Sequence, residues 1–224
     1  MQIFFKELIK HSKKVNIVPE TIEKYKSVST EEFIFIDSFN FLSSSIEKLV
    51  EDLKKEGSEC FTRLKKHFPV DKQFQLLLRK GVYFYDYASD FKVFSETKLP
   101  SPKNFFNKLH DTEISKKDYQ HAENVFKGFN CQTLLEYMEL YVKTDTLLLA
   151  DIFENFRDIA MKTYGLDPVH YISLPSFGRD AMLKQTGVEI ELISDPEIFN
   201  LVKRGVRGGT FKAKKEISNF QETY

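Results

Sequence analysis

The sequence predicts an α/β fold dominated by helices. One run, EEFIFIDSFNFL, is rich in Phe and Ile and is typical of a strand, whereas most of the remaining chain places apolar residues at helical spacing between capping residues and glycines. The clearest helix extends from Gln132 to Tyr164, where Gly165 is placed to end it. A chain of 224 residues with 42% hydrophobic content and 22 Phe has room for one large domain or two small ones.

The strand-like run covers residues 33–41, from Phe33 to Phe41. Both of its faces are mostly apolar, so we expect a central strand of a sheet. A helix should follow, because Ser44 and Glu47 have the spacing of a capping box, and Gly57 should end it. The sequence therefore predicts a strand-to-helix unit here.

The later helices are bounded by the same kinds of signal. The stretch GLDPVHYISLPS, residues 165–176, is rich in turn residues and predicts a seam between a main domain and a smaller helical part. The predicted helix starts are Asp71, Ser101, Ser115, Ser176 and Asp195, and the predicted ends are Gly81, Gly128, Gly187 and Gly205.

Composition excludes several classes of protein. Lys and Arg number 33, as do Asp and Glu, so the net charge does not favour a nucleic-acid partner, and only local clusters could. No apolar run reaches eighteen residues and the N-terminus lacks a cleavage signal, so we expect no membrane partner and no export. Cys60 and Cys131 lack metal-site spacing, which indicates free thiols in an intracellular, reducing compartment.

Asp145 occupies an unusual position in the long helix. It completes the apolar stripe, and so should lie in line with the buried face. The other acids of the segment, Asp151, Glu154 and Asp158, fall on the opposite side, where we expect water to solvate them. The stripe itself consists of Met138, Tyr141, Leu148, Ile152, Phe156 and Ile159.

A carboxylate in an apolar stripe needs a partner, because burial without one is unfavourable. One alternative is structural: a Lys, an Arg or a set of backbone amides. The other is a divalent cation, since Tyr141 lies one turn before Asp145 on the same face. A Tyr-x-x-x-Asp pair suits two-metal phosphodiester hydrolysis, in which the carboxylate holds Mg²⁺ and the phenol orients the attacking water.

A second candidate site is the run KRGVRGGTFKAKK, residues 203–215, which contains six cations and no acid. Its cations could neutralise phosphates while its glycines let the backbone approach a DNA strand. The alternative is a helix end followed by a solvated basic tail. The residues assigned to DNA contact in this run are Arg204, Arg207, Gly208, Gly209 and Lys212.

Several segments together resemble one family, the protein-primed branch of family B DNA polymerases found in large self-synthesising DNA transposons and small phages. YVKTD, which ends at Asp145, is similar to the Tyr-x-x-x-Asp motif of the family's 3′ to 5′ exonuclease. FIDSFNFLSSSIEKLVEDL and RKGVYFYDY resemble the segments between its second and third exonuclease motifs, and VRGGTF resembles the loop that joins exonuclease and polymerase domains. The likeness extends from about Val15 to about Phe211.

This resemblance implies a fold and a function. Residues 1–165 would be the distal part of a ribonuclease-H-like exonuclease domain, in which the strand packs beside the long helix, and residues 166–224 a helical connector toward a polymerase domain. The chain would be a segment of a DNA-directed DNA polymerase that takes part in DNA replication. Its partners would be single-stranded DNA, primer–template DNA and a terminal protein primer.

The resemblance also assigns roles to individual residues. Asp145 would bind Mg²⁺ or Mn²⁺, and Tyr141 would position water. Ser38 and Phe39 stand where the family has Ser or Thr followed by Leu to grip the 3′ end of single-stranded DNA. Gly208 and Gly209 match the glycines of the joining loop, although Val206 stands where phage members have Tyr.

Parts of the family pattern are missing from this sequence. The Asp-x-Glu motif and the Asn/Asp motif that supply further metal ligands would lie before Met1, and the polymerase aspartates after Tyr224, so we expect a middle piece that is inactive alone. The alternative is a non-catalytic DNA-binding or interaction module that kept the scaffold and lost the chemistry.

Overall fold

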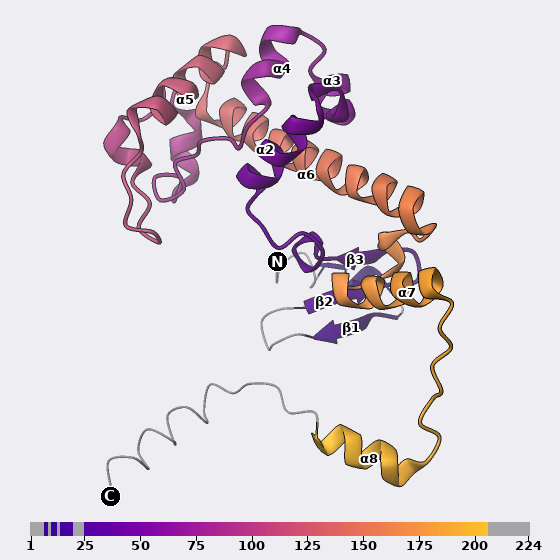
Figure 1. Cartoon of the computed structure of the whole chain (residues 1–224). Helices are drawn as coiled ribbons and strands as arrows, with labels where there is room; N and C mark the ends of the chain where they lie inside the picture. Colours follow the sequence, from indigo (N-terminus) through magenta and orange to yellow (C-terminus); the bar gives the residue numbers. More distant parts are fainter. Residues whose placement is uncertain (1–6, 9, 13, 20–24, 206–224) are drawn as a thin grey trace, which may run out of the picture. The chain divides into compact units, whose positions relative to one another are not determined.

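The computed structural model describes residues 7–8, 10–12, 14–19 and 25–205. Helices dominate it, and a small antiparallel sheet lies near the start of the chain (Figure 1). The chain forms two compact units, Met1–Gln185 and Thr186–Tyr224. The helix-dominated α/β class is confirmed, and the ribonuclease-H-like assignment stays a prediction.

The sheet contains β1 (Asn16–Pro19), β2 (Tyr25–Ser29) and β3 (Ile34–Ile36), in that order. β2 is the middle strand, and its Val28 is 2% exposed. The prediction of a central strand over residues 33–41 is therefore wrong: β3 is short and lies at the edge of the described sheet, where Ile34 is 71% exposed.

The strand stops because Asp37 starts a turn. Its carboxylate accepts a hydrogen bond from the backbone N–H of Phe39, which opens the 3₁₀ helix η1 (Ser38–Asn40). A short acidic side chain that bonds to a nearby backbone N–H competes with strand pairing in this way. Phe41 then packs edge-on against Phe153 and near Phe156 of the long helix, with ring centroids 5.7 and 6.3 Å away, so the end of the run does contact that helix.

Three helices follow and share a core with the long helix: α2 (Ile46–Glu56), α3 (Thr62–His67) and α4 (Asp71–Leu77). Ser45, and not the predicted Ser44, caps α2 by accepting from the N–H of Lys48. Helix α4 ends at Leu77, well before the predicted Gly81. Residues 78–81 thereby become part of a loop, which matters for the site below.

The second half of the first unit is built on α5 (Lys116–Gly128) and α6 (Leu134–Tyr164). Ser115 caps α5 as predicted, and Gly165 ends α6 with φ of 62°. The helix predicted from Ser101 is only the short 3₁₀ turn η4 (Pro102–Phe105). Further short 3₁₀ turns are η2 (Ser58–Cys60), η3 (Phe91–Ser95) and η5 (Pro168–His170).

Helix α7 (Leu174–Thr186) packs on the end of α6 through Phe177 and Ala181, which contact Ala160. The first compact unit therefore continues to Gln185, past the seam at residues 165–176. The functional division into residues 1–165 and 166–224 stays a prediction.

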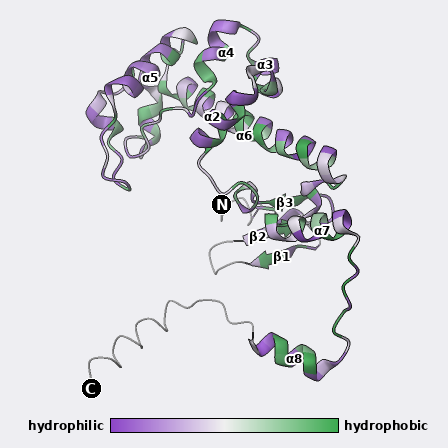
Figure 2. Ribbon diagram, viewed as in Figure 1, coloured by the Kyte–Doolittle hydropathy of each residue, from purple (hydrophilic) through white to green (hydrophobic). Residues whose placement is uncertain are grey.

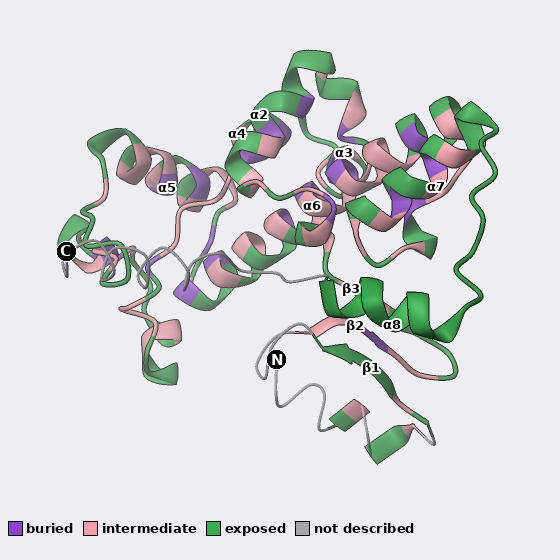
Figure 3. Ribbon diagram, turned by 60° about the horizontal axis from the view of Figure 1, so that its bottom comes forward, coloured by how far each residue is buried: buried purple, intermediate pink, exposed green. Residues whose placement is uncertain are grey.

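Helix α8 (Pro196–Gly205) lies in the second unit and begins as predicted, because the carboxylate of Asp195 accepts from the backbone N–H groups of Glu197 and Ile198. It carries hydrophobic and hydrophilic residues along its length (Figure 2), yet none of its residues is buried (Figure 3). None of the helices in the described ranges is long and apolar enough to cross a membrane. Cys60 and Cys131 form no disulfide.

Candidate functional site

Tyr141 and Asp145 lie one turn apart on α6, and both contact the loop of residues 78–87: the Tyr141 ring at Tyr83 and the Asp145 carboxylate at Gly81. The Tyr141 hydroxyl is hydrogen-bonded to the hydroxyl of Tyr85 in that loop. Asp145 is half-buried, and its Oδ1 atom is buried without a hydrogen-bond partner. The pair therefore shares one side of the helix, as the spacing predicts.

Burial raises the pKa of the Asp145 carboxyl above its ordinary value of 3.8. The Tyr141 hydroxyl, the backbone N–H of Gly81 and the charge of Lys80 act in the opposite direction, but they do not outweigh the loss of solvation. No Lys or Arg within the described ranges forms an ion pair with Asp145. The structural alternative is met only in part, because no Lys or Arg there pairs with Asp145 and one backbone amide, that of Gly81, bonds to it.

Asp151 is the fully buried acid of this helix, since the residue is only 1% exposed. Its two carboxylate oxygens accept from the backbone N–H groups of Arg63 and Leu64, each at 2.9 Å. The prediction that Asp151 is solvated is wrong, because the first N–H groups of α3 have no partner within their own helix and this distant carboxylate supplies one. Asp158 is exposed, as expected.

The buried stripe of α6 is consequently offset from the predicted one. It passes through Thr144, which is 2% exposed, and Asp151, while Asp145 lies at its border. The prediction placed Asp145 in the buried stripe, and the structure places its neighbour Thr144 there instead. The spacing of apolar residues alone did not distinguish these two adjacent positions.

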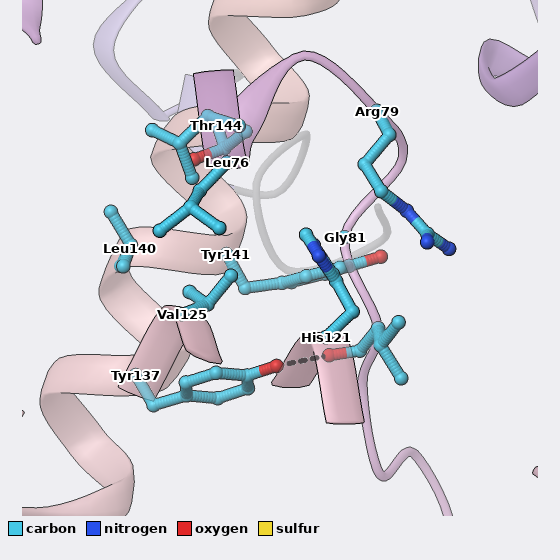
Figure 4. A pocket seen from close by; sticks show the side chains of 11 residues that line it. Leu76, Arg79, Gly81, His121, Val125, Tyr137, Leu140, Tyr141 and Thr144 are labelled. Carbon is cyan, nitrogen blue, oxygen red and sulfur yellow. Dashed lines mark hydrogen bonds between the residues drawn. The ribbon is translucent and has the colours of Figure 1, made fainter. Parts of the chain in front are cut away.

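The loop that faces α6 is fixed at several points. Arg79 forms an ion pair with Asp118 of α5 at 2.7 Å, and the Val82 carbonyl accepts from the Tyr137 hydroxyl at 2.7 Å, a contact seen in Figure 4. Phe84 is completely buried among aromatic rings. These anchors fix the backbone on which Gly81 and the nearby tyrosines stand.

Three tyrosines form a cluster at this surface. The ring of Tyr83 stacks on that of Tyr141, with centroids 4.8 Å apart and planes at 23°, and meets the ring of Tyr85 edge-on at 5.1 Å. Tyr85 is 56% exposed. Burial and the Tyr85 hydroxyl raise the pKa of Tyr141, so its phenol stays protonated near neutral pH.

Two cavities border the cluster. The smaller, of about 20 Å³, lies between α6 and the loop and is lined by Gly81, His121, Tyr137, Tyr141 and Thr144 among others (Figure 4). Burial lowers the pKa of His121 to about 4, so this imidazole is neutral near pH 7. The larger is a cleft of about 200 Å³, whose charged and aromatic lining residues include Glu47, Arg79, Lys80, Tyr83, Tyr85, Glu113 and Asp118.

Sequence reasoning missed Lys80, Gly81, Tyr83 and Tyr85. A signal was present in RKGVYFYDY, where two cations and a glycine precede alternating tyrosines. That composition is typical of a surface that stacks bases and neutralises phosphates.

The described residues fit a metal ion only in part. Asp145 offers one carboxylate oxygen, but no group of three or more His, Cys, Asp or Glu in the described ranges is arranged to hold a metal ion. A two-metal centre needs several such ligands. These residues alone therefore form no such centre.

Ser38 and Phe39 lie in η1, where Phe39 is 59% exposed, and neither lines the two cavities. Phe41, close by, contacts α6 at Phe153, about 12 Å along the helix axis from Asp145 at 1.5 Å per residue. Arg204 stands in the last turn of α8, in the second unit. Arg207, Gly208, Gly209 and Lys212 lie outside the described residues.

Comparison with known proteins gave no match: no protein-family model, no curated protein and no solved structure is significantly similar to this chain. The resemblance to the polymerase family therefore stays a prediction from the quoted motifs.

Proposed function

We propose that this chain is the distal exonuclease segment of a protein-primed family B DNA polymerase, and that the cleft beside Tyr141 and Asp145 binds the 3′ end of single-stranded DNA. The observation that carries the proposal is that the loop which lines the cleft with Lys80 and Tyr85 also contacts the half-buried Asp145, whose Oδ1 atom has no hydrogen-bond partner.

The cleft offers an aromatic face and a cation to single-stranded DNA, although the acids Glu47, Glu113 and Asp118 also line it. The exposed ring of Tyr85 offers a face on which a base can stack, whatever its identity. Lys80 lines the cleft, and no ion pair within the described ranges occupies it, so its charge is available to a phosphate. Arg79 differs, since it already pairs with Asp118.

Asp145 would contribute one oxygen to a divalent cation, and Tyr141 would orient a group near it. A half-buried carboxylate with one oxygen that accepts no hydrogen bond is unfavourable for the fold, and a bound cation would offset that cost. Mg²⁺ or Mn²⁺, when bound, would polarise a phosphate and activate water. The further ligands would come from residues other than those described, which matches a segment of a larger exonuclease site.

A second candidate is a non-catalytic DNA-binding module. It is favoured by the missing group of three metal-binding residues within the described ranges. The two candidates predict the same DNA contacts and differ in whether divalent cations bind at Asp145.

The proposal is tested by the affinity for a labelled oligothymidylate, measured by fluorescence anisotropy. Lys80→Ala should weaken binding several-fold and reduce its salt dependence, because one phosphate contact is lost. Tyr85→Ala should weaken binding, whereas Tyr85→Phe keeps the aromatic face and should retain most of it. Lys66→Ala, at an exposed lysine on α3, is the matched control. Equal effects of Lys80→Ala and Lys66→Ala would remove the cleft from the binding site.

A further inference from the structure

We propose that Gly81 is the positioning residue that sets the place of the Tyr141 ring, and through the Tyr141 hydroxyl the place of Tyr85, which lines the DNA cleft. A Cβ atom added at Gly81 would lie 2.5 Å from Cδ2 and 2.8 Å from Cε2 of Tyr141. Carbon atoms in packed side chains approach to about 3.5–4.0 Å, so the ring would have to withdraw by about 1 Å. Only glycine leaves room for the ring where it stands.

The Tyr141 ring is also held by two other contacts. The ring of Tyr83 stacks on it, and its hydroxyl is bonded to that of Tyr85. The cavity that borders Gly81 and Tyr141 has a volume of about 20 Å³, which accommodates about one water molecule and not an aromatic ring. A displaced ring would therefore disturb the stacking with Tyr83 or the bond to Tyr85.

The backbone of Gly81 cannot easily move away instead. On one side Arg79 is tied to Asp118, and on the other the carbonyl of Val82 accepts from Tyr137. The backbone N–H of Gly81 also interacts with the Asp145 carboxylate and lowers its pKa. Gly81 thus affects both members of the Tyr-x-x-x-Asp pair. Its lack of a Cβ atom leaves room for the Tyr141 ring, and its N–H bonds to the Asp145 carboxylate.

This inference rests on the proposed function only where it concerns DNA. Gly81→Ala keeps every functional group of the cleft and shifts Tyr141. In protein labelled with 3-fluorotyrosine, the ¹⁹F resonance of Tyr141, assigned by its loss in Tyr141→Phe, should move in Gly81→Ala, and that of Tyr85 should move with it. The resonance of Tyr171, which packs against Phe177, should stay in place. Unchanged Tyr141 and Tyr85 resonances would overturn the inference.

A double-mutant cycle tests the same contact through stability. Gly81→Ala should destabilise the wild type, but it should cost much less in a Tyr141→Ala background, where the clashing ring is absent. Equal losses in both backgrounds would show that the effect of Gly81 does not pass through Tyr141. Gly178→Ala, with no atom within 4 Å of the added Cβ, is the control and should not shift the Tyr141 resonance.

Oligothymidylate binding tests whether the position of the Tyr141 ring matters for DNA. Gly81→Ala should weaken oligothymidylate binding several-fold in the wild type and leave it unchanged in Tyr141→Ala. A loss of the same size in both backgrounds would contradict the inference. If the wild type does not bind DNA, the proposed function fails, while the fluorine spectrum and the unfolding cycle still decide the role of Gly81.

Discussion

Asp151 and Asp145 are six residues apart on α6, and their carboxylates differ in how far their hydrogen bonds are satisfied. Asp151 is buried and both of its oxygens accept backbone hydrogen bonds, whereas Asp145 is half-buried and has an oxygen with no partner. The first arrangement stabilises the fold. The second is unfavourable for the fold, which is typical of residues that serve a ligand.

Asp151→Ala should lower the free energy of unfolding by about 3 kcal/mol, because it leaves two N–H groups of α3 without acceptors in a buried place. Urea unfolding followed by circular dichroism measures the change. Asp158→Ala, at an exposed acid of the same helix, should change the free energy of unfolding by less than about 0.5 kcal/mol. A similar cost for both variants would contradict the assigned role of Asp151.

Asp145→Asn should stabilise the chain at neutral pH. The folded-state pKa of Asp145 is raised above 3.8, so its ionised form disfavours folding, and this penalty develops as pH rises from about 3.8 through the folded-state pKa. Urea unfolding of both proteins between pH 3 and pH 7 should show a difference that is largest near neutrality and vanishes at the acidic end. A wild type that is the more stable protein at pH 7 would show that the Asp145 carboxylate is structural.

At the scale of elements, some helix ends followed their local signals, whereas the predicted ends at Ser44, Ser101 and Gly81 did not. Ser115, Gly165 and Asp195 mark their helix ends as predicted, because capping is a local interaction between a side chain or a left-handed glycine and the nearest backbone groups. The strand over residues 33–41 failed for the same physical reason: the local bond of Asp37 to Phe39 outcompeted an apolar pattern that fits a central strand.

Two glycines make a matched test of these helix signals. Gly165 has φ of 62° at the end of α6, so Gly165→Ala should lower the free energy of unfolding by about 1 kcal/mol. Gly178 lies within α7 with open space around it, so Gly178→Ala should raise the free energy of unfolding by about 0.5–1 kcal/mol. Thermal unfolding should therefore show a lower stability for Gly165→Ala and a higher stability for Gly178→Ala. A loss of stability in both variants would contradict the assigned helix signals.

At the scale of the whole molecule, the sequence predicted the α6 side of the site and missed the loop side. Tyr141 and Asp145 follow from helical spacing, which is regular. Gly81, Lys80 and Tyr85 come to the same place only because α4 stops at Leu77 and the loop is tied to α5 and α6. Such contacts depend on tertiary packing, which periodicity does not encode.

We expect the chain alone not to degrade DNA. Two-metal hydrolysis needs carboxylates from several elements, and Mg²⁺, which loses its waters reluctantly, is held poorly by a single Asp. A labelled single strand incubated with the protein in Mg²⁺ or Mn²⁺ should remain intact. Degradation by the wild type and not by Asp145→Ala would contradict this expectation and would show that other acids complete the site.

The most direct measurement of the central claim is photo-crosslinking of a single-stranded oligonucleotide that carries a 4-thiothymidine at its 3′ end, followed by mass spectrometry of the linked peptides. The account predicts crosslinks within residues 79–87 and 141–145, and their loss when the thiothymidine is moved to the 5′ end. Crosslinks that are absent from both segments, or that are the same for 3′ and 5′ probes, would contradict the claim that this cleft holds a DNA 3′ end.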